Sequence, residues 1–188
     1  RVAAKIDSPT DRDSFCNKRV EVSGTMMYDL FREFYKLQFK NIRLAIDKEY
    51  YYQKTHGKNY QGVNFERLVS EDNYHQYFKE RILETGVNRA FKGNWGATAH
   101  TKRIGVIQDL NRLSYNSFIS HLRKINLEMK AGAKLVKPRL LHSSQWGLID
   151  PVDVPDGANT GLHKHLAMVA HITSGCSAQP VLNWLQRE

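Results

Sequence analysis

Basic side chains gather in one segment of the chain, and their chemistry suits a polyanionic partner. Residues 92–139 hold ten Lys or Arg against two acidic residues, and these ten belong to the 28 Lys or Arg of the whole chain. Lys and Arg that neutralise phosphates release counterions, which gives affinity for nucleic acid without regard to sequence. The segment is predicted either to bind a polyanion or to form a solvated basic surface, and charge alone leaves both open.

Metal and nucleophile chemistry have weaker support. Asp11 and Asp13 are the nearest approach to a carboxylate cluster, and we interpret them as part of an ion-paired turn with Lys18 and Arg19. His163 and His165 are expected at the start of a helix, where a spacing of two does not place both on one face for a metal ion. No metal site is therefore predicted in this chain.

Cys16 and Cys176 have no paired spacing and are expected to be free thiols. No Ser or Cys stands in a nucleophile motif, so a hydrolase that uses one of the histidines is disfavoured.

The elements that must position these residues are predicted to be amphipathic helices. The first begins at an N-cap Thr25 and ends near residue 48, and a polar excursion follows over residues 50–70. A second helix is expected over residues 70–92, with a break at Gly86 and an end at Gly93. Trp95 and Trp146 lie next to glycines, and packing is favoured over base stacking for both.

The second half of the sequence alternates loops and short helices. Basic loops are expected over residues 98–105 and 128–141, with a helical region between them from Val106 to Leu122. A short helix is expected from Thr160 through Val169, and a last helix from Ser177 with Pro180 in its first turn. The predicted fold is mainly α, with long irregular basic loops and a few short strands.

Bulk properties fit one ordinary domain, or one domain and part of another. The chain has 188 residues, of which 41% are hydrophobic and 25% charged, as in globular proteins. No apolar run has the length of a bilayer span, so no membrane partner is expected. The chain begins without Met and stops in a predicted helix, which we interpret as the two ends of a fragment.

Several short motifs, in order and close to the expected spacing, resemble one family. Residues 105–124 read GVIQDLNRLSYNSFISHLRK, which resembles GVSQVLNR and SHLRR in the fork region of the second-largest subunit of multisubunit DNA-directed RNA polymerases. Downstream, KLVKPR, LHSSQWG, PVDVPDG and GLHKHLAM are similar to that family's KLAKPR, LHNTHWG, PAETPEG and GLVKNLALM. Upstream, DRDSFCNKR and GNWG match motifs of the protrusion and the start of the fork.

The resemblance implies a set of residues that bind nucleic acid through its backbone. Polar and basic positions would line the hybrid channel or hold phosphates at the base of a fork loop, and these are Gln108, Asn111, Arg112, His121, Arg123, Lys124, Lys134, Lys137, Arg139 and Asn159. Taken alone, Gln108 and His121 would be read as ordinary helix residues. Asp156 stands where the family has a glutamate near the nucleotide site, with one methylene less.

The family also implies the role of the segment. Residues 1–92 would form the C-terminal part of a protrusion-like domain, 93–172 the fork domain and 173–188 the start of the external domain. The chain would line the active-site cleft and position the RNA–DNA hybrid and downstream DNA, together with the largest subunit and other polymerase subunits. Mg²⁺ would be held by the largest subunit, no catalytic residue lies in this chain, and the isolated fragment is expected to be inactive.

Two matters stay open from the sequence. Gln145, Asp150 and Asp109 depart from the family pattern, which suggests a divergent viral or protist member. The location would be intracellular, either the nucleus or, for a viral protein, a cytoplasmic factory or virion. The alternative function is a free-standing helical nucleic-acid-binding module, which the localised positive charge supports equally, and which the flanking gene sequence would distinguish.

Overall fold

The computed structural model describes residues 2–6, 8–56, 68–78, 81–129 and 132–187. They form two compact units, one made of Arg1–Val20 with Leu110–Glu188, and the other of Glu21–Asp109. Helices dominate the described chain, and one small sheet of two strands accompanies them. This agrees with the mainly α fold predicted from the sequence.

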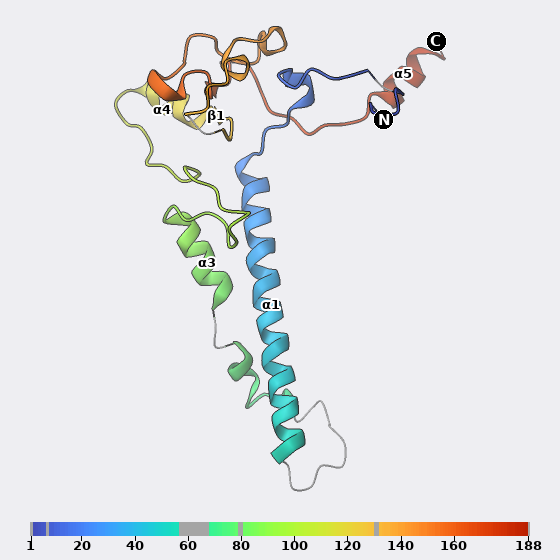
Figure 1. Ribbon diagram of the computed structural model, residues 1–188, viewed down its shortest axis with the longest axis vertical. Coiled ribbons are helices and arrows are strands. Elements are labelled where there is room, and N and C mark those ends of the chain that lie inside the picture. The colour runs from blue at the N-terminus through green and yellow to red at the C-terminus, as the bar shows by residue number, and fades with distance from the viewer. Residues whose placement is uncertain (1, 7, 57–67, 79–80, 130–131, 188) are drawn as a thin grey trace. The chain divides into compact units, whose positions relative to one another are not determined.

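Two helices lie side by side in the Glu21–Asp109 unit (Figure 1). They are α1 (Ser23–His56) and α3 (Ile82–Phe91), with a short 3₁₀ helix at Tyr74–Phe78. The core of this unit consists of Leu30, Phe34, Ala90 and Trp95. Burial of such apolar side chains stabilises the pair by about 1.5–3 kcal/mol for each large residue.

Helix α1 is longer at both ends than the sequence predicts. It begins at Ser23, before the expected N-cap Thr25, and it includes residues 50–56, for which a surface excursion was expected. Contacts at helical spacing accompany the extra turns, because Gln53 Nε2 donates to Glu49 Oε1 at 2.9 Å and the ring of Tyr52 stacks on His56. The rest of the expected excursion, residues 57–67, lies outside the described residues.

The predicted break at Gly86 is wrong, because Gly86 lies inside α3 and is buried there. A Cβ at this position would come within 2.3 Å of the Phe34 ring, so the glycine serves a close helix approach and not a chain break. The predicted helix end is confirmed, since α3 ends at Phe91 and Gly93 follows with φ of +103°.

Helix α3 takes its N-terminal cap from a neighbouring helix. The N-cap residue Arg81 provides no side-chain cap, and Gln38 Oε1 of α1 accepts the N–H groups of Ile82 at 2.8 Å and Leu83 at 3.3 Å. The first N–H groups of a helix lack partners within it, so Gln38 satisfies two of them. This helix begins at Ile82, whereas the sequence predicted a start near residue 70.

The unit that contains the second half of the chain is built on α4 (Tyr115–Leu122) and a two-stranded sheet. Residues 106–113 were expected to be helical and are not, because Ser114 begins α4 with a capping box to Ser117. Strand β1 (Lys124–Asn126) pairs antiparallel with β2 (His163–His165) in the register Lys124 to His165.

The helix expected over residues 160–169 is therefore wrong, and so is the placement of His163 and His165 at a helix start. The N–H of Leu127 donates to the Leu162 carbonyl at 2.9 Å, and the N–H of Leu166 donates to the Arg123 carbonyl at 3.0 Å, which extends the pairing at both ends. Pairing with β1, which is distant in sequence, thus outweighs the helical pattern of apolar residues in this segment.

The last predicted helix is confirmed as α5 (Gln179–Leu185), with Pro180 in its first turn. The described residues of this unit also include four 3₁₀ turns, at Phe15–Asn17, Lys137–Arg139, Ser143–Gln145 and Gly157–Asn159. Within the described ranges, no helix has both the length and the apolar character that crossing a membrane requires.

Candidate nucleic-acid interface

Three of the predicted nucleic-acid-binding residues line one groove. Asn111, His121 and Lys124 border an open groove of about 470 Å³ at the end of α4 and the start of β1. Other polar side chains complete its wall, namely Asn116, Ser117, Ser120, Asp153 and His165. Amide, hydroxyl, imidazole and ammonium groups at one place are suited to the phosphate and sugar oxygens of a nucleic-acid backbone.

Hydrogen bonds hold the loop before α4 against the helix. The N–H of Asn111 donates to His121 Nδ1 at 3.1 Å, and Asn111 Oδ1 accepts from the N–H of Leu113 at 3.0 Å and from Ser117 Oγ at 3.2 Å. Because a backbone N–H is always a donor, Nδ1 of His121 is the acceptor in the bond with Asn111. The loop and helix thus form one preorganised wall.

Arg112 lies beside this wall on an exposed surface. Its guanidinium carbon stands 4.7 Å from the centre of the Phe118 ring, a cation–π arrangement that orients the planar group. A guanidinium that lies over a ring can still donate its N–H groups to acceptors, and the phosphate contact expected of Arg112 stays a prediction.

Two predicted phosphate ligands bind backbone carbonyls of the chain itself. Arg123 Nη2 donates to the carbonyls of Ala167 and Ala170, each at 2.7 Å. Arg139 Nη1 donates to the carbonyls of Ala158 at 2.7 Å and Thr160 at 2.8 Å. These guanidinium groups hold residues near β2, so the chain's own backbone already occupies part of each group.

The remaining predicted residues are not among those that line the groove. Gln108 belongs to the Glu21–Asp109 unit, where its Nε2 donates to the Gly105 carbonyl at 2.7 Å. Lys134 is exposed, and Asp156 and Asn159 are exposed at the Gly157–Asn159 turn. Lys137 lines a different pocket. The nucleic-acid roles of all these residues, including those in the groove, remain predictions.

Buried ionisable groups lie next to the groove. Burial lowers the pKa of His163, and the positive charge of Lys124 and the proximity of His165 lower it further. His165 Nδ1 lies 2.8 Å from the Asp153 carbonyl oxygen and 3.5 Å from Asp153 Oδ1. Burial also lowers the pKa of Lys164, whose side chain lies in the sheet. His163 is therefore neutral near pH 7 and adds no positive charge to the groove.

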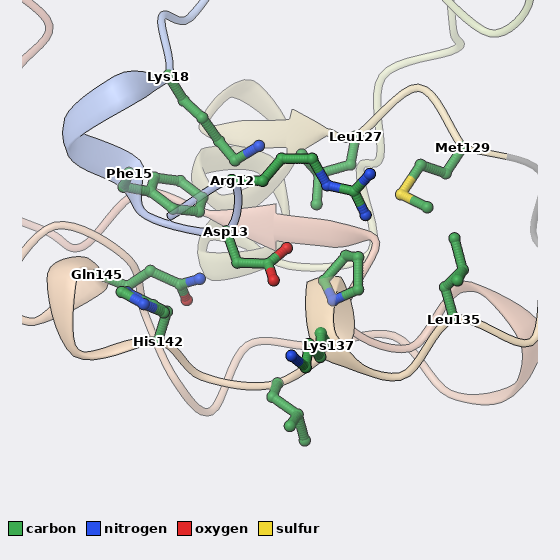
Figure 2. A pocket seen from close by; sticks show the side chains of 12 residues that line it. Arg12, Asp13, Phe15, Lys18, Leu127, Met129, Leu135, Lys137, His142 and Gln145 are labelled. Carbon is green, nitrogen blue, oxygen red and sulfur yellow. The ribbon is translucent and has the colours of Figure 1, made fainter. Parts of the chain in front are cut away.

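The second pocket, about 270 Å³ in volume, was missed by the sequence reasoning (Figure 2). It brings Arg12, Asp13 and Lys18 of the DRDSFCNKR motif close to Lys137. The motif carried the signal, but it was interpreted as an ion-paired turn. Its basic side chains lie outside the basic segment, which begins at residue 92.

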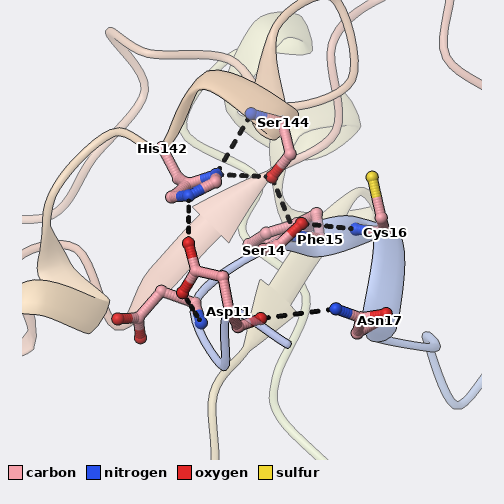
Figure 3. Close-up of polar contacts among 8 residues, drawn as sticks. Asp11, Ser14, Phe15, Cys16, Asn17, His142 and Ser144 are labelled. Carbon is pink, nitrogen blue, oxygen red and sulfur yellow. Dashed lines mark hydrogen bonds and ion pairs between the residues drawn. The ribbon is translucent and has the colours of Figure 1, made fainter. Parts of the chain in front are cut away.

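The ion-paired turn predicted for Asp11 is also wrong. Asp11 Oδ2 lies 2.8 Å from His142 Nε2 (Figure 3). Arg19 Nη1 donates to the carbonyls of Cys16 and Lys18. Hydrogen bonding to the Asp13 N–H, followed by that to His142, lowers the pKa of Asp11. The pair connects two segments that are 131 residues apart in sequence.

The two tryptophans differ in their surroundings. Trp95 is 6% exposed and packs in the core, as expected, whereas Trp146 is 87% exposed, so its predicted packing role is wrong within this chain. Among the described residues, no group of three or more His, Cys, Asp or Glu is arranged to hold a metal ion.

Comparison with known proteins gives a consistent relationship. Residues 108–172 match a family model described as RNA polymerase Rpb2, domain 3. The chain is 38% identical over 178 residues to DNA-directed RNA polymerase II subunit 2 of Arabidopsis thaliana, an alignment that covers 94% of this chain and 14% of that protein.

Similarity extends to other lineages. The chain is 34% identical over 188 residues to subunit RPB2 of RNA polymerase II from Encephalitozoon cuniculi, with 98% of this chain and 15% of that protein covered. It is 32% identical over 173 residues to subunit Rpo2 of Sulfolobus acidocaldarius, with 92% and 14% covered. The chain thus spans about one seventh of the length of these relatives. By these matches, the chain belongs to the family of second-largest subunits of DNA-directed RNA polymerases, of which it corresponds to one segment.

Proposed function

We propose that this segment lines the active-site cleft of a DNA-directed RNA polymerase and positions the RNA–DNA hybrid and downstream DNA. The observation that carries the proposal is the groove of Asn111, His121 and Lys124, which lies within the residues matched by the family model. A polymerase must hold every sequence equally, so contacts to phosphate and sugar are the required kind. Residues 93–172 are proposed as a fork-type domain whose basic loops project toward nucleic acid.

The chain would contribute to catalysis by positioning, as part of an enzyme completed by the largest subunit and the other subunits. Nucleotidyl transfer needs Mg²⁺ held by clustered carboxylates. The described carboxylates do not fit such a site, since none of them join in a metal-binding group and Asp11 is bonded to His142. We therefore assign Mg²⁺ to the rest of the enzyme and expect the isolated chain to make no RNA.

Exposed apolar side chains favour this role over a free-standing module. Phe31, Trp146 and Val152 are among many large hydrophobic residues that are at least half exposed. A protein that works alone rarely exposes so much apolar surface, whereas a segment of a large subunit covers it with neighbouring domains. The eukaryotic RNA polymerase II relatives support a nuclear location, and the comparisons give no support to a viral origin.

The test is binding of a short RNA–DNA hybrid to the chain and to a double variant, Arg112→Gln with Lys124→Gln. We expect the variant to bind at least tenfold more weakly at low salt, because two phosphate contacts are removed. The matched control is Lys5→Gln with Arg187→Gln, which removes the same charge from the same unit but outside the groove.

An equal loss of affinity in both double variants would contradict the proposal, because net charge would then explain the binding. Template-dependent nucleotide incorporation by the isolated chain would contradict the assignment of the chemistry to other subunits.

A further inference from the structure

We propose that the pocket between the DRDSFCNKR motif and the Lys137–Arg139 turn binds an adenine nucleotide through its phosphate and its base. It is separate from the groove of Asn111, His121 and Lys124, and none of its lining residues is shared with that groove. Its volume of about 270 Å³ lies just below the usual range for ligand pockets, about 300–1,000 Å³, so it has room for no more than a single nucleotide.

Three basic side chains line the pocket, together with one acidic side chain, so the net charge of the lining is positive. Arg12, Lys18 and Lys137 contribute positive charge, and Asp13 is the acidic residue among the lining side chains. In the described part of the chain, no hydrogen bond or ion pair engages the side chains of Arg12 and Lys18. Cations that converge on a pocket without partners are suited to charge-assisted hydrogen bonds with a phosphate.

Apolar side chains form much of the remaining wall. Phe15, Leu127, Met129, Leu135 and Pro138 line the pocket, and Figure 2 shows Leu127 and Met129 beside the guanidinium of Arg12. A flat heterocycle gains from burial against such a wall, and phosphate alone does not. The ligand therefore needs an anionic end and a flat, largely apolar body.

One polar atom among the lining residues favours a ligand that carries a hydrogen-bond donor. Gln145 is 2% exposed, and its Oε1 has no hydrogen-bond partner. An unsatisfied buried acceptor is destabilising, and a ligand that donates a hydrogen bond to it would remove that cost. The exocyclic amino group of adenine is such a donor, and it lies at the opposite end of the nucleotide from the phosphate.

The neighbouring contacts fix this lining in place. Figure 3 shows His142 held between Asp11 and Ser144, with its Nδ1 2.7 Å from Ser144 Oγ. Ser144 Oγ also accepts the N–H of Phe15 at 2.8 Å, which attaches the motif to the Ser143–Gln145 turn. The cations and the amide thus come from two segments that are bonded to each other, as a preformed binding site requires.

The experiment titrates the chain by calorimetry with AMP, adenosine, inorganic phosphate and a 5′-phosphorylated oligoadenylate. We expect saturable binding of AMP that is at least tenfold tighter than that of adenosine or phosphate, because only AMP engages both ends of the pocket. The oligoadenylate arm identifies the source of the nucleotide. If it binds more tightly than AMP, the pocket receives a strand end, and otherwise a free nucleotide.

Two double variants test the residues. Arg12→Gln with Lys18→Gln should weaken AMP binding by tenfold or more, since each loss of a charge-assisted bond amounts to about a factor of ten. Lys5→Gln with Arg187→Gln removes the same charge outside the pocket and should leave AMP binding within twofold. Gln145→Leu should reduce the preference for AMP over purine riboside monophosphate, which lacks the amino group.

A measurement on the unmodified chain keeps the test independent of how the variants fold. Periodate-oxidised AMP forms a Schiff base with nearby lysines, and borohydride reduction followed by mass spectrometry locates the product. We expect labelling at Lys18 or Lys137, with protection by excess AMP. Absence of saturable AMP binding, equal weakening in both double variants, or unprotected labelling spread over surface lysines would each overturn the proposal. Loss of hybrid binding at the groove would leave it unaffected.

Discussion

The ring of Phe34 occupies the space that a side chain on Gly86 would need. A Cβ built on Gly86 would stand 2.3 Å from two ring carbons of Phe34, closer than real Cβ contacts. Phe34 is 8% exposed and belongs to the core of its unit, so the ring has little room to move. The two helices can therefore approach closely only with glycine at this position.

Replacing Gly86 with Ala is expected to lower the free energy of unfolding. Overpacking costs about 1–3 kcal/mol. Alanine regains up to about 1 kcal/mol of helix propensity, which is the smaller effect. Gly24→Ala in α1 is the matched control, because nothing lies within 4 Å of its Cβ position, and it should be neutral or stabilising. Urea unfolding of both variants makes the comparison, and equal effects would refute the packing argument.

Arg123→Lys is expected to destabilise the chain although it keeps the charge. The guanidinium donates to the carbonyls of Ala167 and Ala170, each at 2.7 Å. The ammonium group of lysine lacks the planar arrangement of donors that a guanidinium offers, so it cannot reproduce both hydrogen bonds. A loss of about 1.5–3 kcal/mol is expected, the usual worth of one hydrogen bond to a charged group. Thermal unfolding measures it. A variant with unchanged stability and weaker hybrid binding would instead assign Arg123 to nucleic acid.

Acid should weaken the contact between Asp11 and His142. Bonds from the Asp13 N–H and from His142 lower the pKa of Asp11, so the folded state favours the carboxylate. The resulting stability is present above the ordinary pKa of 3.8 and is lost as the pH falls through the lower folded value. Melting temperatures from pH 6 to below pH 3 should fall less steeply for Asp11→Asn than for the unmodified chain. Asp156→Asn, which removes an exposed carboxylate elsewhere, should leave the slope unchanged.

Salt should reveal how many phosphates the groove neutralises. If Lys124 contacts one phosphate, Lys124→Gln should reduce the slope of log K against log salt by about 0.9 in magnitude. Lys5→Gln should leave that slope unchanged. Fluorescence anisotropy with a labelled hybrid at several salt concentrations provides the slopes. An identical slope for Lys124→Gln and the unmodified chain would remove Lys124 from the interface.

Local signals predicted part of this fold well. Apolar periodicity indicated α1, the glycine at residue 93 indicated the end of α3, and Pro180 indicated the start of α5. These features depend on residues within a few positions of one another, and such short-range rules apply there.

Features that depend on distant partners were not predictable. Residues 163–165 form a strand because β1 pairs with them, and Arg123 is a structural residue because its carbonyl partners lie 44 and 47 residues away. For the candidate site, the resemblance named Asn111, His121 and Lys124, which the structure places around one groove, and their role in binding nucleic acid stays a prediction. The resemblance did not indicate that Arg123 and Arg139 donate to backbone carbonyls, because the sequence alone does not reveal whether an arginine binds a carbonyl or a phosphate.

The bond from Gln38 to the first turn of α3 has a consequence for how this unit assembles. Residues 82–91 make a helix of ten residues, too short to persist alone in water. The acceptor for the first two N–H groups of this helix is Gln38 Oε1, which belongs to α1. The N-terminal end of α3 is therefore fixed only after the segment packs against α1. Helix α1 thus acts as a template that sets the register of its neighbour, and a peptide of residues 82–91 should be mostly coil.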